Sequence, residues 1–329
     1  VPIDATITVT PVATSFAYVP DASGKISAFN TVTKELVTSM AVGSDPYGVS
    51  VSPDGSRVFV TNRGSNTVSV ISSSTHQVIG TIPVDGSPSG VVVSADGSKV
   101  YVANTSSGSI SVIDASTQSV VASIPVTASL PEGLALNADG TRLYVIGGNQ
   151  MSVISTFSNA EINTVSLGSI LTSLKAVAVS SLTGRIYVVD GGFGMNSVYV
   201  IDPLTHAVAS TINPGQNPSG IVISPDGKTA YVSASDSHHI AFVNLTTNVV
   251  SPVAAGSFPR SLAISPDGLW LYAVSEFDGA IYIVNTSTRA IRGSIEASAA
   301  VQANFVSGGI GCVGDEKTFT ITVNPTPVV

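Results

Sequence analysis

Charged residues are scarce in this chain of 329 residues: Asp, Glu, Lys and Arg together make up 10%, against about 25% in typical soluble domains. The 13 basic and 21 acidic residues give a formal net charge of −8. Nucleic-acid-binding proteins normally present a basic face. We therefore expect no nucleic-acid partner.

Cysteine is almost absent. The single Cys312 excludes an internal disulfide, and no Cys-x-x-Cys-His motif exists for covalent haem attachment. Long apolar runs are missing as well, although hydrophobic residues make up 43% of the chain. Ser, Thr, Gly or Pro interrupts every Val-rich run before it reaches the ~18 residues of a membrane helix. The sequence thus predicts no membrane insertion, while its hydrophobic content is ample for a folded core.

A unit of about 42 residues is repeated along the chain. Each copy holds an aromatic anchor in a Val-rich segment, at Tyr18, Phe59, Tyr101, Tyr144, Tyr187, Tyr231 and Tyr272. Seven units account for most of the chain. A period of roughly 40–50 residues with four short strands per unit is typical of a β-propeller blade.

Within each unit, four short segments read as antiparallel strands. A Gly-Val-x-Val-Ser segment is followed by Ser-Pro-Asp-Gly, as at 52–55, 224–227 and 265–268. Pro presets φ, Asp bonds its own backbone and Gly accepts a left-handed conformation, so this tetrapeptide favours a hairpin turn. The aromatic segment, a third strand as at 111–114 and a fourth as at 120–124 complete the unit. The predicted fold is an all-β, seven-bladed propeller with four antiparallel strands per blade.

The first unit lacks its innermost strand, and a ring must close to avoid exposed strand edges. The favoured donor is the segment 301–307, which would complete the first blade from the C-terminal side. The rival donor is 7–10, shortly before Tyr18. The predicted domains are an N-terminal strand or linker at 1–15, the propeller at 16–307 and a C-terminal tail at 308–329.

The segments 59–62 and 101–104, together with the Ser-Pro-Asp-Gly turns, resemble the YVTN repeat of prokaryotic propellers, a WD40-like architecture. The resemblance covers about 16–307 and extends to lactonase-like propellers. It implies a secreted or cell-surface protein and supports closure by a C-terminal strand. The tail at 317–327 resembles the end of an Ig-like repeat of large surface proteins; the alternative is a pair of terminal strands packed on the ring. Such resemblances define a fold better than a function.

In a four-stranded blade, the loops entering the first strands and the turns between second and third strands share one rim, where propeller ligands usually bind. The predicted ligand-binding rim residues are Arg63, Glu132, Lys175, Asp190, Phe258, Arg260 and Glu276. Glu132, Lys175 and Arg260 lie closest to the channel. Their opposite charges suit an anionic or sugar-like ligand, or else form one ion-pair patch that fills the mouth.

For a metal, the candidate ligands are Asp236 and His238 on one turn. His238 and His239 are adjacent on the chain, so they would point to opposite faces of a strand and would not share one ion. The alternative is an exposed turn that binds no metal.

The sequence is compatible with three classes of function. The favoured one is a non-catalytic recognition module, a monomer that binds a protein or glycan at the channel mouth, with no catalytic residue and no cofactor. The first alternative is a metal-dependent, lactonase-like hydrolase or lyase with a divalent cation at the same rim. The second is a structural spacer in a surface array.

Overall fold

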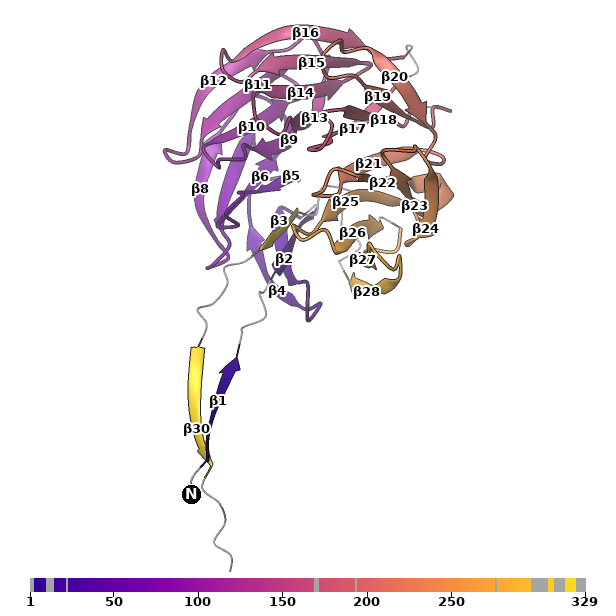
Figure 1. Cartoon of the computed structure of the whole chain (residues 1–329). Coiled ribbons are helices and arrows are strands. Elements are labelled where there is room, and N and C mark those ends of the chain that lie inside the picture. The colour runs from indigo at the N-terminus through magenta and orange to yellow at the C-terminus, as the bar shows by residue number, and fades with distance from the viewer. Residues whose placement is uncertain are drawn as a thin grey trace, which may run out of the picture.

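The computed structural model describes residues 3–9, 15–21, 23–168, 172–192, 194–275, 277–296, 307–310 and 317–323. Seven four-stranded antiparallel sheets stand around a central axis (Figure 1). Within the described residues the only helix is one short 3-10 turn, Ser235–Ser237, and none could cross a bilayer. The predicted seven-bladed, all-β propeller is confirmed.

Each blade runs from an inner strand at the axis to an outer strand at the circumference. The first contains β29 (Ser307–Ile310), β2 (Ser15–Asp21), β3 (Lys25–Asn30) and β4 (Leu36–Ala41). The second contains β5 (Pro46–Val51), β6 (Arg57–Asn62), β7 (Thr67–Ser72) and β8 (Gln77–Pro83), and the third β9 (Pro88–Val93), β10 (Lys99–Asn104), β11 (Ser109–Asp114) and β12 (Ser119–Pro125). The fourth contains β13 (Pro131–Leu136), β14 (Arg142–Gly147), β15 (Gln150–Ser155) and β16 (Ala160–Ser166), and the fifth β17 (Leu174–Val179), β18 (Ile186–Asp190), β19 (Ser197–Ile201) and β20 (Val208–Ile212). The sixth contains β21 (Pro218–Ile223), β22 (Thr229–Ala234), β23 (His239–Asn244) and β24 (Val250–Ala254), and the seventh β25 (Pro259–Ile264), β26 (Trp270–Ser275), β27 (Ala280–Asn285) and β28 (Ile291–Glu296).

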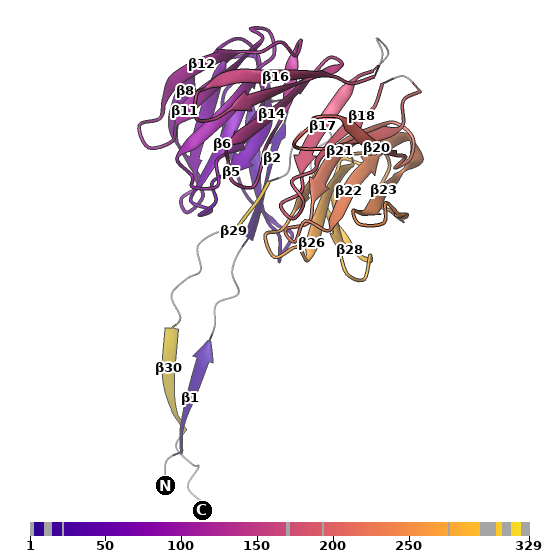
Figure 2. The same ribbon diagram turned by 45° about the horizontal axis from the view of Figure 1, so that its top comes forward.

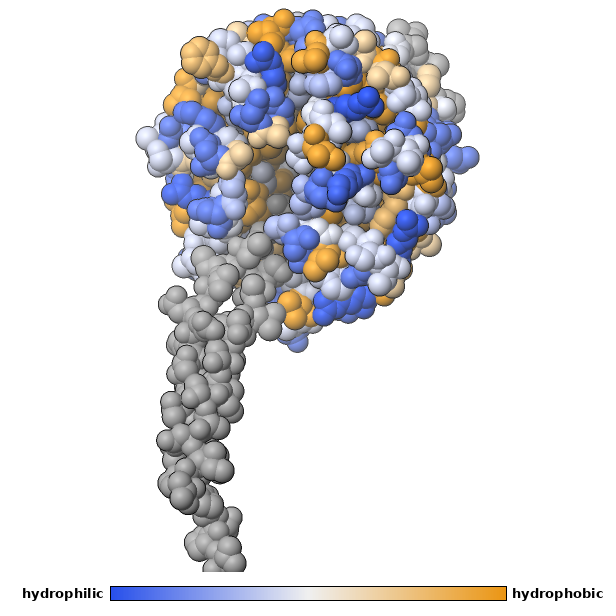
Figure 3. Space-filling model, in the orientation of Figure 1, coloured by the Kyte–Doolittle hydropathy of each residue, from blue (hydrophilic) through white to orange (hydrophobic). Residues whose placement is uncertain are grey.

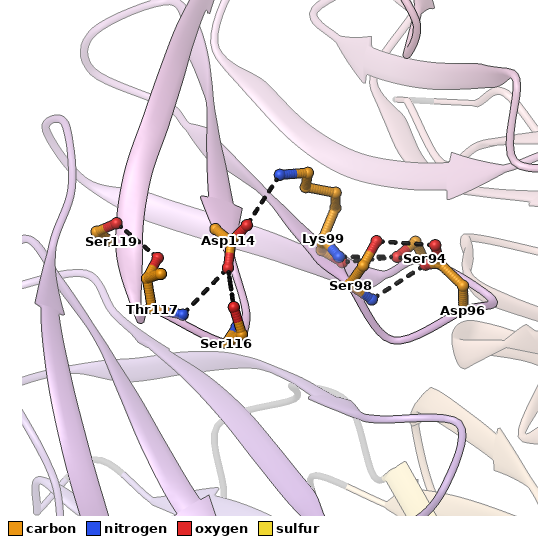
Figure 4. Close-up of polar contacts among 8 residues, drawn as sticks. All are labelled: Ser94, Asp96, Ser98, Lys99, Asp114, Ser116, Thr117 and Ser119. Atoms are coloured by element: carbon orange, nitrogen blue, oxygen red, sulfur yellow. Dashed lines mark hydrogen bonds and ion pairs between the residues drawn. The ribbon is translucent and has the colours of Figure 1, made fainter.

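The turns on the rim away from the predicted site are stabilised by short Asp–Ser contacts. In the third blade, Asp96 accepts hydrogen bonds from the Ser94 hydroxyl at 2.6 Å and the Ser98 amide at 3.0 Å (Figure 4). These bonds favour the ionised carboxyl and lower the pKa of Asp96 to about 2. In the next hairpin Asp114 accepts the Thr117 amide at 3.1 Å and the Lys99 ammonium at 3.2 Å. The repeated turn chemistry therefore sets each hairpin locally.

The core lies between blades rather than in one centre. Seven clusters of buried aliphatic and aromatic side chains each join two neighbouring blades. One of them packs Ala17, Val19 and Phe29 of the first blade against Tyr272 and Ile281 of the last. The anchor aromatics on the second strands are all buried. Because the first and last blades share a core, the ring is closed by packing as well as by strand pairing.

The C-terminal donor of the closing strand is confirmed. β29 pairs antiparallel with β2, from Ser15 opposite Ile310 to Tyr18 opposite Ser307, and it contacts the inner strands β5 and β25 on either side. The described strand begins at Ser307, where the predicted segment ended; 301–306 lie outside the described residues. The rival donor was wrong: β1 (Ile3–Val9) pairs with β30 (Lys317–Val323) instead, away from the ring (Figures 1 and 2).

The outer strands are exposed and partly apolar. Val78 and Ile79 on β8, and Val120 and Val121 on β12, are more than one third exposed. Each of these strands carries a register shift at this point, and such bulges disfavour edge-to-edge pairing with other chains. On the face seen in Figure 3, apolar and polar residues are interspersed and no single apolar expanse dominates.

Candidate functional site: the mouth of the central channel

The inner strands start with a bulge. On β5, Pro46 lies opposite Asn62, but regular pairing resumes only at Val49 opposite Val60. A corresponding shift occurs on β9, β13, β17, β21 and β25. A bulge takes one residue out of the ladder and re-aims its side chain. The residues that follow the first strand position are Tyr47, Ser89, Glu132, Lys175, Ser219 and Arg260.

The chain enters five of these strands through a left-handed residue. Asp45, Ser87, Leu130, Asn217 and Phe258 each precede the strand's Pro and have φ between +50° and +59°. Asp and Asn accept this conformation readily, whereas a bulky side chain is disfavoured there. The sharp entry thus immediately precedes the Pro and the bulge residue of each of these strands.

The glycine after the bulge residue makes room for the next blade. A Cβ on Gly48 would lie 2.3 Å from the Ser89 carbonyl oxygen, and one on Gly90 would lie 2.2 Å from the Glu132 carbonyl oxygen. A Cβ on Gly220 would lie 2.4 Å from the Arg260 carbonyl oxygen. The Pro-x-Gly pattern therefore places the backbone of the bulges at Ser89, Glu132 and Arg260 against the preceding blade.

Hydroxyl groups bond the same carbonyls. Thr61 donates to the Ser89 carbonyl at 2.6 Å, and Ser233 donates to the Arg260 carbonyl at 2.5 Å while accepting the Gly220 amide at 2.7 Å. Thr61 and Ser233 are fully buried, where leaving a backbone group unpaired is costly. These bonds hold the mouth residues on a rigid frame.

Five of the six bulge residues line one cavity of about 470 Å³ at the axis. The cavity brings together three of the predicted site residues, Glu132, Lys175 and Arg260, and adds Tyr47 and Ser219. Lys175 and Arg260 are exposed, whereas Glu132 and Tyr47 are half-buried. Two cationic groups, one carboxylate and one phenol thus converge from four different blades.

Arg63 lies beside the mouth, where it packs on the ring of Tyr47. Its guanidinium carbon lies 3.6 Å from the centre of the Tyr47 ring, a cation–π arrangement. Its Nε and Nη2 atoms are buried and have no hydrogen-bond partner. Burial raises the pKa of the Tyr47 hydroxyl, the nearby Glu132 raises it further, and Arg63 and Arg260 oppose the rise. Tyr47 was not predicted as a site residue, although its place between Pro and Gly marks it.

Asp190 does not face the mouth. It was predicted on the ligand-binding rim but is the last residue of β18 and is fully buried. Its carboxylate accepts the amides of Ser173 and Gly192, each at 3.0 Å, and the Tyr199 hydroxyl at 3.1 Å. Ser173 immediately precedes β17, the strand that carries Lys175, and Gly192 lies in the turn after β18. The Asp190 carboxylate therefore links the start of β17 to that turn.

Phe258 and His238 form an aromatic cluster at the edge of the mouth. Their rings lie 4.9 Å apart, edge to face, and the Phe258 amide donates to His238 Nδ1 at 3.3 Å. The Phe277 ring lies 5.5 Å from that of Phe258 and is 79% exposed. We call His238, Phe258 and Phe277 the aromatic cluster.

The predicted metal ligands are held by other contacts. Asp236 accepts the Asn217 side-chain amide at 3.2 Å, and His238 belongs to the aromatic cluster. In the part of the chain that the structure describes, no three His, Cys, Asp or Glu residues gather into a metal-binding group. The predicted rim residue Glu276 lies outside the described residues.

A second cavity of about 420 Å³ adjoins the mouth. We call it the amide groove; it is lined by Gly191, Gly192, Gly194, Asn196, Gln216, Asn217 and Asp236. Gly191 and Asn217 line both cavities, so the amide groove continues the mouth between the fifth and sixth blades. The sequence signal for it was the irregular turn after β18.

Comparison with protein families agrees with this architecture. The family model described as "Lactonase, 7-bladed beta-propeller" matches residues 12–121 and 186–306. The chain belongs to this lactonase propeller family. Among solved structures, Kuenenia stuttgartiensis hydrazine synthase is similar to this family member with 22% sequence identity and a TM-score of 0.74, over 81% of this chain and 91% of the other. That likeness concerns the fold alone. A comparison with curated proteins found no match.

Proposed function

We propose that this propeller is a non-catalytic recognition module of the YVTN type, from a secreted or cell-surface prokaryotic protein, and that it binds a protein or glycan at the mouth of its channel. The observation that carries the proposal is the mouth cavity itself. Tyr47, Glu132, Lys175 and Arg260 reach it from the bulges at the start of the inner strands, and hydroxyls of the preceding blades bond the Glu132 and Arg260 carbonyls. A rigid site loses little conformational entropy on binding, which favours recognition.

The second candidate is a lactonase-like hydrolase with a divalent cation, and membership of the lactonase propeller family supports it. Oxygen ligands suit such a cation. The described residues that line the mouth supply one carboxylate, Glu132, so they do not form a complete set of ligands. Metal analysis of the purified protein, combined with hydrolysis assays on a panel of lactones, tests this candidate. Lactone hydrolysis that depends on a stoichiometric metal would show that the protein is an enzyme and would contradict the recognition proposal.

The recognition proposal is tested with Lys175→Ala. The purified chain is screened against glycan and peptide arrays, and the affinity for the best binder is measured by calorimetry. A hydrogen bond to a charged group contributes about 1.5–3 kcal/mol, so we expect a loss of roughly 10- to 100-fold without a change in melting temperature. Lys228→Ala is the matched control, because Lys228 is exposed and lies beside Asp226 in a first-to-second-strand turn. Equal affinity of both variants would contradict the proposal.

A further inference from the structure

The amide groove offers hydrogen-bonding groups that its own contacts do not use up. The Asn196 side-chain oxygen accepts the Asn217 amide at 3.0 Å, which leaves the Asn196 NH₂ group directed away from that bond. Asp236 uses Oδ1 to accept from Asn217, while its second carboxylate oxygen makes no bond to the other described residues that line the groove. Planar amide and carboxylate groups of this kind can each engage two adjacent hydroxyls, with donor and acceptor in fixed geometry.

The floor of the groove is bare backbone. Gly191, Gly192 and Gly194 line it, and a Cβ on Gly194, where φ is +75°, would meet nothing within 4 Å. Glycine allows a ligand to approach the backbone closely. The backbone at Gly194 is therefore accessible to a flat polar ring, whereas Gly191 is packed against the Pro218 carbonyl.

The aromatic cluster belongs to the same rim and begins two residues after Asp236, although its members do not line the groove itself. His238 follows Asp236 by two residues and contacts Phe258, which in turn contacts the exposed Phe277. A pyranose ring presents a polar edge of hydroxyls and an apolar face of C–H groups. The first matches the amide groove and the second matches an exposed aromatic ring.

The mouth differs in charge from the rest of the molecule. The chain carries a net charge of −8, yet Lys175 and Arg260 line the mouth with a single described carboxylate, Glu132. Arg63, stacked on the cavity-lining Tyr47, adds a third positive charge beside the mouth. Cationic side chains form strong hydrogen bonds with carboxylate oxygens, so the mouth, which Lys175 and Arg260 line, is suited to a ligand that brings acceptor oxygens.

From these features we propose that the ligand is an acidic oligosaccharide, whose carboxylate-bearing residue occupies the mouth and whose uncharged neighbour lies in the amide groove. Among the described residues no aliphatic side chain lines that groove, whereas peptide recognition normally relies on apolar anchor pockets or strand addition. This inference rests on the proposed recognition function and specifies its ligand.

The test uses the full chain and a panel of short oligosaccharides that join glucuronate, galacturonate or sialate to neutral sugars. Each free acid, each neutral oligosaccharide and an acidic tetrapeptide serve as comparators, with affinities from calorimetry. We expect at least one acidic oligosaccharide to bind 10-fold or more tightly than its free acid. Gln216→Ala and Asn196→Ala should remove that gain and leave binding of the free acid unchanged, while Lys175→Ala weakens both.

Matched controls are available in the same chain. Gln77→Ala removes an exposed glutamine from β8, and Phe157→Ala removes a ring that is 97% exposed on another hairpin; neither should alter affinity, whereas Phe277→Ala should lower it. If a free acid binds the mouth but no oligosaccharide binds more tightly, the glycan inference is wrong while recognition stands. Tighter binding of the tetrapeptide, insensitive to Gln216→Ala, would assign the mouth to a protein ligand. If nothing on the panel binds, the inference is overturned.

Discussion

The contact between Gly90 and the Glu132 carbonyl makes a quantitative prediction for Gly90→Ala. A new Cβ would lie 2.2 Å from that backbone oxygen, whereas ordinary van der Waals contact begins at 3.4 Å. The backbone of one blade must therefore move by about 1 Å relative to the next. Overpacking of this kind costs roughly 1–3 kcal/mol, and a cost near 2 kcal/mol would change the folding equilibrium about 30-fold. We expect the midpoint of urea unfolding to fall accordingly.

Gly86→Ala is the control for this prediction. Its Cβ would meet the Ser107 hydroxyl at 3.0 Å, and that exposed side chain can rotate at the loss of one surface hydrogen bond with the Gly86 amide. We expect less than about 1 kcal/mol of destabilisation. If Gly90→Ala is no more destabilising than Gly86→Ala in the same denaturation assay, the close packing of successive bulges is refuted as the reason for the Pro-x-Gly pattern.

Three further predictions concern stability. Burial lowers the pKa of His76 below its unfolded value of about 6.5. The unfolded state therefore binds more protons, and the protein becomes less stable as the pH drops through that value. His76→Asn should flatten this part of the plot of melting temperature against pH, and an unchanged plot would contradict the prediction. Leu130→Asn, at a position with φ of +52°, should gain roughly 0.5–1 kcal/mol by calorimetry because Asn tolerates this conformation, and a lower melting temperature would count against it. Ser233→Ala should cost about 1–3 kcal/mol because it leaves the Gly220 amide unpaired and removes one of the hydrogen bonds to the Arg260 carbonyl, which also accepts from Ser219; neutral denaturation data would show that these bonds do not stabilise the mouth.

The repeat explains why the fold could be predicted in detail. Turn residues such as Asp96 act locally, and the buried aromatics recur at a fixed spacing, so each blade can be recognised without its neighbours. The closing strand was harder to place. β29 is short and has no aromatic anchor, and only its pairing with β2 defines it, which is a contact between residues far apart in sequence.

The site was predicted only in part, because rim position does not determine where a side chain points. Glu132, Lys175 and Arg260 were found from their loops, and the structure brings them together. Asp190 was misplaced because burial and its three hydrogen-bond donors are tertiary properties. Tyr47 was left out of the predicted site although its place between Pro and Gly is readable in the sequence; the register of β5 and β6 shows the bulge that presents it.

The sheet shared by β29 and the first three strands has a consequence for the order of folding. During synthesis β2, β3 and β4 emerge first, but their inner partner emerges only after the six other blades. Until then the first blade has an unpaired edge beside the channel, and the interface with the seventh blade is absent. Ring closure must therefore follow translation of nearly the whole propeller. Pairing of β29 with β2 is then the step that converts an open intermediate with an exposed strand edge into a closed ring.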